Sequence, residues 1–175
     1  IHLVGAKPVL AEMSPDHMVD PFSVESKITD RTKAIMPVQL NGRTCDMDAL
    51  QTIAEQNNLL IVEDSAQALG SKFKGKCAGT FGAFGTFSFY PAKVLGSFGD
   101  GGALVTNDDR IGREVSLLRD HGRDDTGKVI AWGTNSRLDN VQAAVLLHKF
   151  QTYDKDVERR REIAGKYDAA LSGIN

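Results

Sequence analysis

A continuous apolar run, Leu59-Leu60-Ile61-Val62, most constrains what this chain can fold into. Such a run is typical of a parallel strand that is covered by other elements on both faces. It follows a segment in which Asp46 can cap a helix whose apolar residues fall on one face; these are Met47, Leu50, Ile53 and Ala54. We expect further strands at residues 34–38, 86–89 and 103–106. Strands that alternate with helices predict an α/β fold with a mostly parallel sheet.

Turn and capping residues complete the expected outline of the chain. Asp20-Pro21 predicts the start of a short helix that ends near Lys27. Pro37 weakens the strand expected at 34–38, because proline removes a donor from the ladder. The remaining expectations are a hairpin within 71–76, a helix capped by Asn107, and a long helical region from Asp139 with a break near Tyr153.

Composition narrows the class of protein. The 175 residues are 41% hydrophobic and 25% charged, with a formal net charge of -2, which argues against a broad nucleic-acid surface. Basic residues gather between Lys155 and Arg161, but acidic residues interleave them, as on a solvated helix face. Only Cys45 and Cys77 are present, without metal-like spacing, and no apolar run could span a bilayer. We expect a cytoplasmic protein with no metal site and no membrane partner.

Two chemically useful side chains stand where strands are expected to end. Lys93 follows the apolar strand around Phe87-Ser88-Phe89 and precedes a glycine-rich turn, and Asp64 follows the apolar run described above. In parallel sheets, ligands bind outside the carboxyl ends of the strands. A lysine that forms a Schiff base and an aspartate that pairs with a pyridine nitrogen are the groups that pyridoxal phosphate (PLP) needs. Read singly, Lys93 is an ordinary surface lysine and Asp64 an ordinary helix cap.

Other polar residues allow both an ordinary and a functional interpretation. Gln67 could reach the phenolic oxygen of the same ring, and Ser88 could bind a phosphate, although a strand hydroxyl is usually satisfied by backbone. The glycines of 99–102 permit close backbone approach, but they lack the strand, spacing and helix of a dinucleotide fingerprint. The segment 133–139, which contains Asn135 and Arg137, alone looks like a capped helix start.

Together these motifs resemble the DegT/DnrJ/EryC1/StrS family of sugar aminotransferases. The resemblance covers essentially the whole chain and rests on Glu63-Asp64-Ser65-Ala66-Gln67, Phe87 to Lys93, Gly99-Asp100-Gly101-Gly102, and Asn135 to Ala144. Within the family, the chain looks closest to enzymes that aminate a nucleotide-linked 3-keto sugar.

The resemblance implies a fold-type I PLP-dependent transferase and gives each site residue a role. Lys93 would hold PLP as a Schiff base, Asp64 would pair with the pyridine nitrogen, Gln67 with the ring oxygen, and Ser88 with the phosphate. Asn135 would reach the phosphate of a neighbouring subunit in a homodimer with shared sites, and Arg137 would lie near substrate. Residues 1–150 would form part of the large PLP-binding domain, and residues 151–175 would connect toward a small C-terminal domain.

Family members are roughly twice this length, so we expect the sequence to be a fragment. The segments outside it would supply a turn that binds phosphate, an aromatic residue that stacks on the pyridine ring, and the smaller domain. The implied reaction moves an amino group from an amino acid, with glutamate expected, to a nucleotide-linked keto sugar in polysaccharide or amino-sugar biosynthesis. Lys93 would shuttle the proton in a ping-pong scheme.

Two alternatives remain open at the level of the sequence. One is a PLP-dependent sugar dehydratase of the same family, although such members carry histidine where Lys93 stands. The other is a non-catalytic protein that keeps the fold and binds a partner or senses the cofactor.

Overall fold

The computed structural model describes residues 1–174, which divide into two compact units. The first unit comprises Ile1–Phe87 and Ala103–Ser136, and the second comprises Ser88–Gly102 and the segment from Arg137 onward. The first unit begins with a short 3-10 helix, His2–Val4. None of the helices within residues 1–174 is both long enough and apolar enough to cross a membrane.

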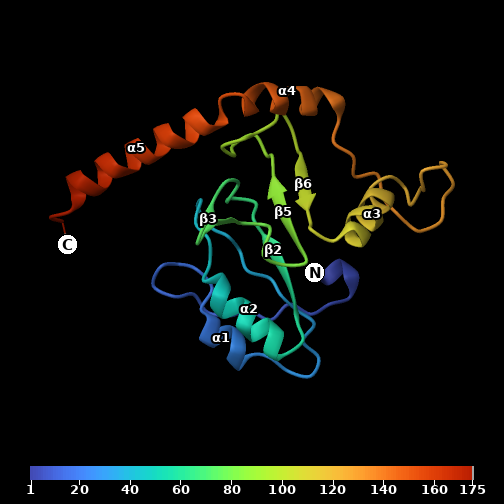
Figure 1. Cartoon of the computed structure of the whole chain (residues 1–175), viewed down its shortest axis with the longest axis horizontal. Coiled ribbons are helices and arrows are strands. Elements are labelled where there is room, and N and C mark those ends of the chain that lie inside the picture. Colours follow the sequence, from blue (N-terminus) through green and yellow to red (C-terminus); the bar gives the residue numbers. More distant parts are fainter. Residues whose placement is uncertain (175) are drawn as a thin grey trace. The chain divides into compact units, whose positions relative to one another are not determined.

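A four-stranded sheet has the order β1-β2-β5-β6. These strands are β1 (Ala34–Ile35), β2 (Leu60–Asp64), β5 (Phe84–Ser88) and β6 (Gly102–Val105). β2 pairs in parallel with both β1 and β5, whereas the arrows of β5 and β6 run in opposite directions in Figure 1. The predicted α/β fold with a mostly parallel sheet is therefore confirmed.

The strand expected at 34–38 is shorter than predicted, because regular pairing stops after Ile35. Pro37 has no N–H to donate, although its carbonyl oxygen accepts from Asp64 N at 3.0 Å. Pairing resumes only as a single bridge between Val38 and Asp64. β2 in turn begins one residue later than expected and continues through Glu63 to Asp64, so that both acidic residues belong to the strand.

Aspartates cap the helices of the first unit. The caps predicted for α1 (Pro21–Ser26) and α2 (Met47–Gln56) are confirmed, since Asp20 accepts from Phe22 N and Asp46 from Ala49 N. The cap predicted for α3 (Asp109–Leu118) is wrong by one residue. Asp108, not Asn107, accepts the first backbone N–H groups, the nearest at 2.7 Å, because its carboxylate stands one position before the helix.

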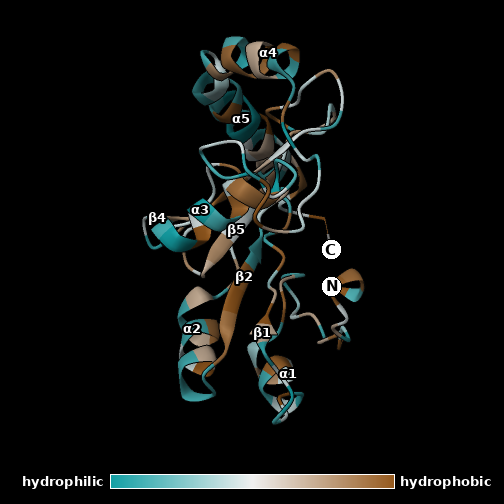
Figure 2. Cartoon of the chain, turned by 90° about the vertical axis from the view of Figure 1, so that its right-hand side faces the viewer, coloured by the Kyte–Doolittle hydropathy of each residue, from teal (hydrophilic) through white to brown (hydrophobic). Residues whose placement is uncertain are grey.

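The apolar core of the first unit lies where α1 and α2 pack together and α2 packs on β1 and β2. Its buried members are Met18, Val24, Ile35, Cys45, Met47, Leu50, Ile53, Ala54 and Ile61. The four predicted apolar residues of α2 are among them, and Figure 2 shows the apolar character of β2. The predicted hairpin forms from β3 (Lys72–Phe73) and β4 (Lys76–Cys77), which pair antiparallel.

The second unit consists of the loop between β5 and β6 and two helices, α4 (Asn140–Phe150) and α5 (Tyr153–Leu171). The predicted break near Tyr153 is confirmed, because a turn separates the helices (Figure 1). The charged residues of α5 are exposed, and Arg159 pairs with Glu162 at 2.8 Å, as expected of a solvated face. Figure 2 shows the hydrophilic colour of much of this helix.

Candidate functional site

A buried carboxylate lies beside the expected cofactor-binding aspartate. Glu63 is fully buried in β2, on the strand face that also buries Ile61. Its Oε1 accepts from the backbone N–H groups of Phe81 and Gly82 at 2.6 and 3.0 Å. Its Oε2 accepts from Gly79 N at 2.7 Å and from the Gln39 side chain at 2.9 Å. Four donors therefore satisfy this charge and attach the loop at 79–82 to β2.

Gln39 extends this network to a third segment. Its side chain is fully buried, and its Oε1 accepts from Cys45 N at 2.7 Å. Its own backbone N–H donates to Asp64 O at 2.8 Å. Sequence reasoning gave no role to Gln39 or Glu63. For Glu63 a signal existed, since an acidic residue at a position that strand alternation turns inward needs buried donors.

Asp64 ends β2, and Gln67 lies on the turn directly after the strand. The turn packs beside residues 39–42, because Gly42 N donates to Gln67 O at 2.8 Å and Asn41 N donates to Gln67 Oε1 at 3.2 Å. Asp64 Oδ1 accepts from Ala66 N at 3.1 Å, which orients the half-buried carboxylate. The structure therefore brings these two predicted residues together at one supported strand end.

Ser88 ends β5, and Lys93 lies on the turn that follows it; both belong to the second unit. Ser88 Oγ accepts from Tyr90 N at 3.2 Å, and Lys93 N donates to Tyr90 O at 2.9 Å. The Lys93 side chain is half-buried, as expected for an amine whose stem is covered by apolar surface. The turn is closed at its base by Ser97, whose backbone N–H and buried hydroxyl both lie 2.8 Å from Phe89 O.

Asn135 and Arg137 lie on either side of the boundary between the units. Asn135 is in the first unit, at the end of a narrow loop that is closed by a bridge to Asp120. The loop is narrow because Gly122 and Gly133 cross closely: a Cβ on Gly133 would lie 2.2 Å from Gly122 N. Arg137 is exposed in the second unit, three residues before α4.

The hydrogen-bonding groups indicate which kind of ligand these residues could hold. The Ser88 and Gln67 oxygens already accept backbone N–H groups, so the Ser88 hydroxyl proton and the Gln67 amide remain as donors. Asp64 contributes an acceptor oxygen, and Lys93 contributes an amine. In the first unit, the Asp64 oxygen and the Gln67 amide suit a pyridinium N–H and a ring oxygen. In the second unit, the Ser88 hydroxyl suits a phosphate and the Lys93 amine suits a Schiff base. PLP offers a partner to each of these groups.

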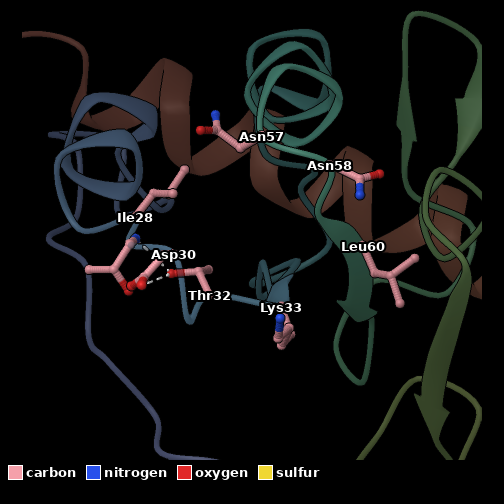
Figure 3. A pocket seen from close by; sticks show the side chains of 8 residues that line it. Ile28, Asp30, Thr32, Lys33, Asn57, Asn58 and Leu60 are labelled. Carbon is pink, nitrogen blue, oxygen red and sulfur yellow. Dashed lines mark hydrogen bonds between the residues drawn. The ribbon is translucent and has the colours of Figure 1, made fainter.

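The pocket drawn in Figure 3 lies elsewhere and contains none of the predicted site residues. It is lined by Ile28, Thr29, Asp30, Thr32, Lys33, Asn57, Asn58 and Leu60. Leu60 begins β2, whereas Asp64 ends it, so this pocket is at the opposite end of the strand. Within residues 1–174, no group of three or more histidine, cysteine, aspartate or glutamate side chains could hold a metal ion.

Comparison with known proteins identifies the family. The DegT/DnrJ/EryC1/StrS aminotransferase family matches residues 1–175. The chain belongs to this family. The resemblance inferred from the motifs is therefore confirmed, and the family match covers both turns described above.

Individual relatives agree with this assignment. The chain is 44% identical to a pleiotropic regulatory protein of Geobacillus stearothermophilus, over 95% of this chain and 45% of the relative. It is 40% identical to the UDP-2-acetamido-2-deoxy-3-oxo-D-glucuronate aminotransferase of Pseudomonas aeruginosa, over 99% of this chain and 49% of that enzyme. The chain thus spans about half the length of the curated relatives that it matches.

A solved structure confirms the fold. The chain superimposes on DesV of S. venezuelae, solved in complex with a ketimine intermediate, with a TM-score of 0.95 and 44% sequence identity. The match covers 99% of this chain and 47% of DesV. The expected architecture of a fold-type I PLP-dependent transferase is thereby confirmed for this chain.

Proposed function

We propose that the protein carrying this chain is a PLP-dependent aminotransferase that moves an amino group from an amino acid to a nucleotide-linked keto sugar. The observation that carries the proposal is the set of complementary groups at two strand ends and the turns that follow them, with Asp64 and Gln67 at the first and Ser88 and Lys93 at the second. Family membership over the full chain supports the same reaction class.

Each residue has a defined task in this proposal. Asp64 would accept a hydrogen bond from the protonated pyridine nitrogen, the Gln67 amide would donate to the ring oxygen, and the Ser88 hydroxyl would donate to the phosphate. Lys93 would be the covalent attachment point, and its amine, once free, would take a proton from the amino donor and later return it. Bound PLP supplies the electron sink for this chemistry. The same residues, acting in reverse order, serve the keto sugar.

The substrate class follows from the relatives. The Pseudomonas aeruginosa relative is named for a UDP-linked 3-oxo sugar acid, and we propose a nucleotide-linked keto sugar for this chain, with glutamate as the amino donor. The product would enter polysaccharide or amino-sugar biosynthesis. Arg137, close in sequence to Asn135, is our candidate for a contact with the sugar substrate.

We propose a cytoplasmic homodimer with shared sites, in which Asn135 of one subunit binds the phosphate held by the other. Cys45 and Cys77 are both free thiols, which suits a reducing compartment. Residues 1–150 belong in this proposal to the PLP-binding domain, and residues 151–175 lead toward a smaller domain.

The deciding experiment replaces Lys93 in the natural gene product that contains this sequence. Lys93→Ala should abolish transamination of a panel of nucleotide-linked keto sugars with glutamate, whereas Lys155→Ala, which removes an exposed lysine of α5, should not. A Lys93→Ala protein that turns over at the wild-type rate would rule out the assignment.

Asp64→Ala tests the second half of the proposed site. It should lower the transamination rate more than the thermal stability, because the half-buried carboxylate serves the ring nitrogen and bonds only Ala66 N within the described residues. Full-rate transamination by this variant would refute the role assigned to Asp64.

A second candidate function, a non-catalytic regulatory protein with this fold, is favoured by the name of the Geobacillus relative. The visible spectrum of the purified natural protein separates the two. A band from a lysine-bound cofactor that glutamate bleaches supports the aminotransferase, and a colourless protein that PLP cannot reconstitute supports the regulator. A dehydratase is disfavoured, because the chain retains lysine at position 93.

A further inference from the structure

Helix α4 holds the loop that carries Lys93 through two side chains. Gln142 Oε1 accepts from Phe98 N at 2.8 Å, and Lys149 Nζ donates to Gly96 O at 2.6 Å. Gln142 and Lys149 are seven positions apart, which is close to two helical turns, so both project from the same face of α4. They therefore attach the loop to the helix at two points, one on each side of Ser97.

The attachment reaches the turn of Lys93 through tight packing. Gly96 is buried against that turn: a Cβ at this position would lie 2.5 Å from Pro91 O and 2.8 Å from Tyr90 O. Lys93 N donates to the same Tyr90 carbonyl at 2.9 Å. Because Gly96 packs tightly against the turn, a displacement of Gly96 would disturb the backbone from which the Lys93 side chain projects.

The Lys149 contact is stronger than an ordinary surface interaction. Its ammonium is part-buried where it meets the Gly96 carbonyl, and it also lies 5.4 Å from the centre of the Phe98 ring. A charge-assisted hydrogen bond and a cation–π contact thus converge on residues two apart in the loop. Ser97, between them, is buried, and its hydroxyl lies 2.5 Å from Gly99 O.

We propose that Gln142 and Lys149 are positioning residues that fix the turn of Lys93 and thereby orient its amine for proton transfer. The inference rests on the proposed function, because it assigns Lys93 the reacting amine. Both side chains bond to the backbone of the loop, so their effect on the Lys93 amine passes through the backbone of residues 90–98. Displacing a reacting group by about 1 Å can cost on the order of a hundredfold in rate.

The test uses Gln142→Leu and Lys149→Met in the natural gene product. Each removes one loop contact and keeps a side chain of similar length. Matched controls are Gln151→Leu, which changes an exposed glutamine after α4, and Lys155→Met, which changes an exposed lysine of α5. Lys149→Arg keeps a donor and a positive charge and should restore most of the lost function.

The first readout uses cofactor-free protein. PLP is added, the linkage to Lys93 is reduced with borohydride, and the labelled peptide is measured by mass spectrometry over time. We expect capture to slow by about tenfold in Gln142→Leu and Lys149→Met, and amide exchange at Phe98 to accelerate, with no change in the controls. In the steady state, kcat should fall by a similar factor while KM for the sugar stays within about twofold.

The outcomes separate the two proposals. If wild-type protein captures no PLP at Lys93, the proposed function is wrong and the positioning role falls with it. If wild type captures PLP but both variants match it in capture and kcat, even with faster exchange at Phe98, the contacts only support the fold and the positioning role is overturned. If one variant fails to fold by circular dichroism, the other variant decides: a fall in its kcat with an unchanged KM supports the role, and wild-type constants refute it.

Discussion

Replacing Glu63 by glutamine isolates what the buried charge contributes to the site. The change keeps the size and shape of the side chain, but it converts one acceptor oxygen into an NH₂ group. In the native protein each oxygen accepts two N–H donors, from Phe81 and Gly82 at Oε1 and from Gly79 and Gln39 at Oε2. In either orientation of the new amide, its NH₂ group takes the place of one oxygen, and the two donors that had bonded to that oxygen are left without an acceptor.

The neighbouring amide cannot relieve this conflict. If the NH₂ group takes the Oε2 position, Gln39 could turn its own amide to accept from it. The turned Gln39 would then present its NH₂ to Cys45 N, which now donates to Gln39 Oε1 at 2.7 Å. The N–H groups of Gly79 and Cys45 would then both lack an acceptor. At about 2 kcal/mol for each buried unsatisfied donor, Glu63→Gln should destabilise the first unit by about 4 kcal/mol.

Amide hydrogen exchange by mass spectrometry measures this loss without assuming two-state unfolding of a multidomain protein. Protection of the segment 77–83 should fall by a factor that corresponds to about 4 kcal/mol, roughly a thousandfold. Glu55→Gln, which changes an exposed glutamate of α2, is the control and should stay within about 0.5 kcal/mol. Protection of 77–83 within about 1 kcal/mol of wild type would refute the reasoning that the four donors depend on a carboxylate.

Three further outcomes follow from local geometry. Gly96→Ala should destabilise the protein by about 2 kcal/mol in thermal unfolding, because its Cβ would lie 2.5 Å from a backbone oxygen. Gly165→Ala in α5, where a Cβ would meet no atom within 4 Å, should stabilise the helix by about 1 kcal/mol. Equal effects of the two changes would contradict this reasoning. Backbone N–H groups at the start of α3 hold the pKa of Asp108 below its usual value, so its cap is fully formed above the usual carboxyl pKa and lost as pH falls through the lowered one. Amide exchange should show acid fraying of α3 in wild type but not in Asp108→Asn, whose amide caps without titrating. Burial raises the pKa of the Cys45 thiol, so iodoacetamide should label exposed Cys77 in native protein and Cys45 only after unfolding; early labelling of Cys45 would argue against its burial.

The fold was largely predictable because its determinants are local. The apolar run at 59–62, the apolar face of α2 and the aspartate caps each report their element through neighbouring residues. The failures arose where two local signals compete. Pro37 lacks the N–H that a regular strand needs, yet it is buried as a strand residue would be. The pattern of apolar residues alone therefore could not show that β1 ends at Ile35. Asn107 and Asp108 are both good caps, and only the geometry of the chain selects between them.

The site was predictable in its chemistry but not in its support. Asp64 and Lys93 could be found because their residue types and their positions after apolar strands carry the chemical signal. The position of Glu63 in its strand signals burial, but the partners of Glu63, Gln39 and Gln142 could not be identified. They lie between 6 and 44 positions away along the chain, and most of them are backbone groups. Any residue type offers a backbone N–H, so such partners leave no trace in the sequence.

The two turns obtain their order in the same physical way. Each is a short segment without regular secondary structure, and its backbone would be mobile if only local bonds held it. In the first unit the Glu63 carboxylate and Gln39 tie β2 and the neighbouring loop together beside Asp64. In the second unit Gln142 and Lys149 tie the loop of Lys93 to a helix. Because the two sets of supports share no residue, loss of one should leave the order of the other turn intact. Glu63→Gln should therefore leave exchange at Phe98 unchanged, and Lys149→Met should leave the protection of 77–83 unchanged. Loss of protection at both places in either variant would mean that the two turns are stabilised as one cooperative unit.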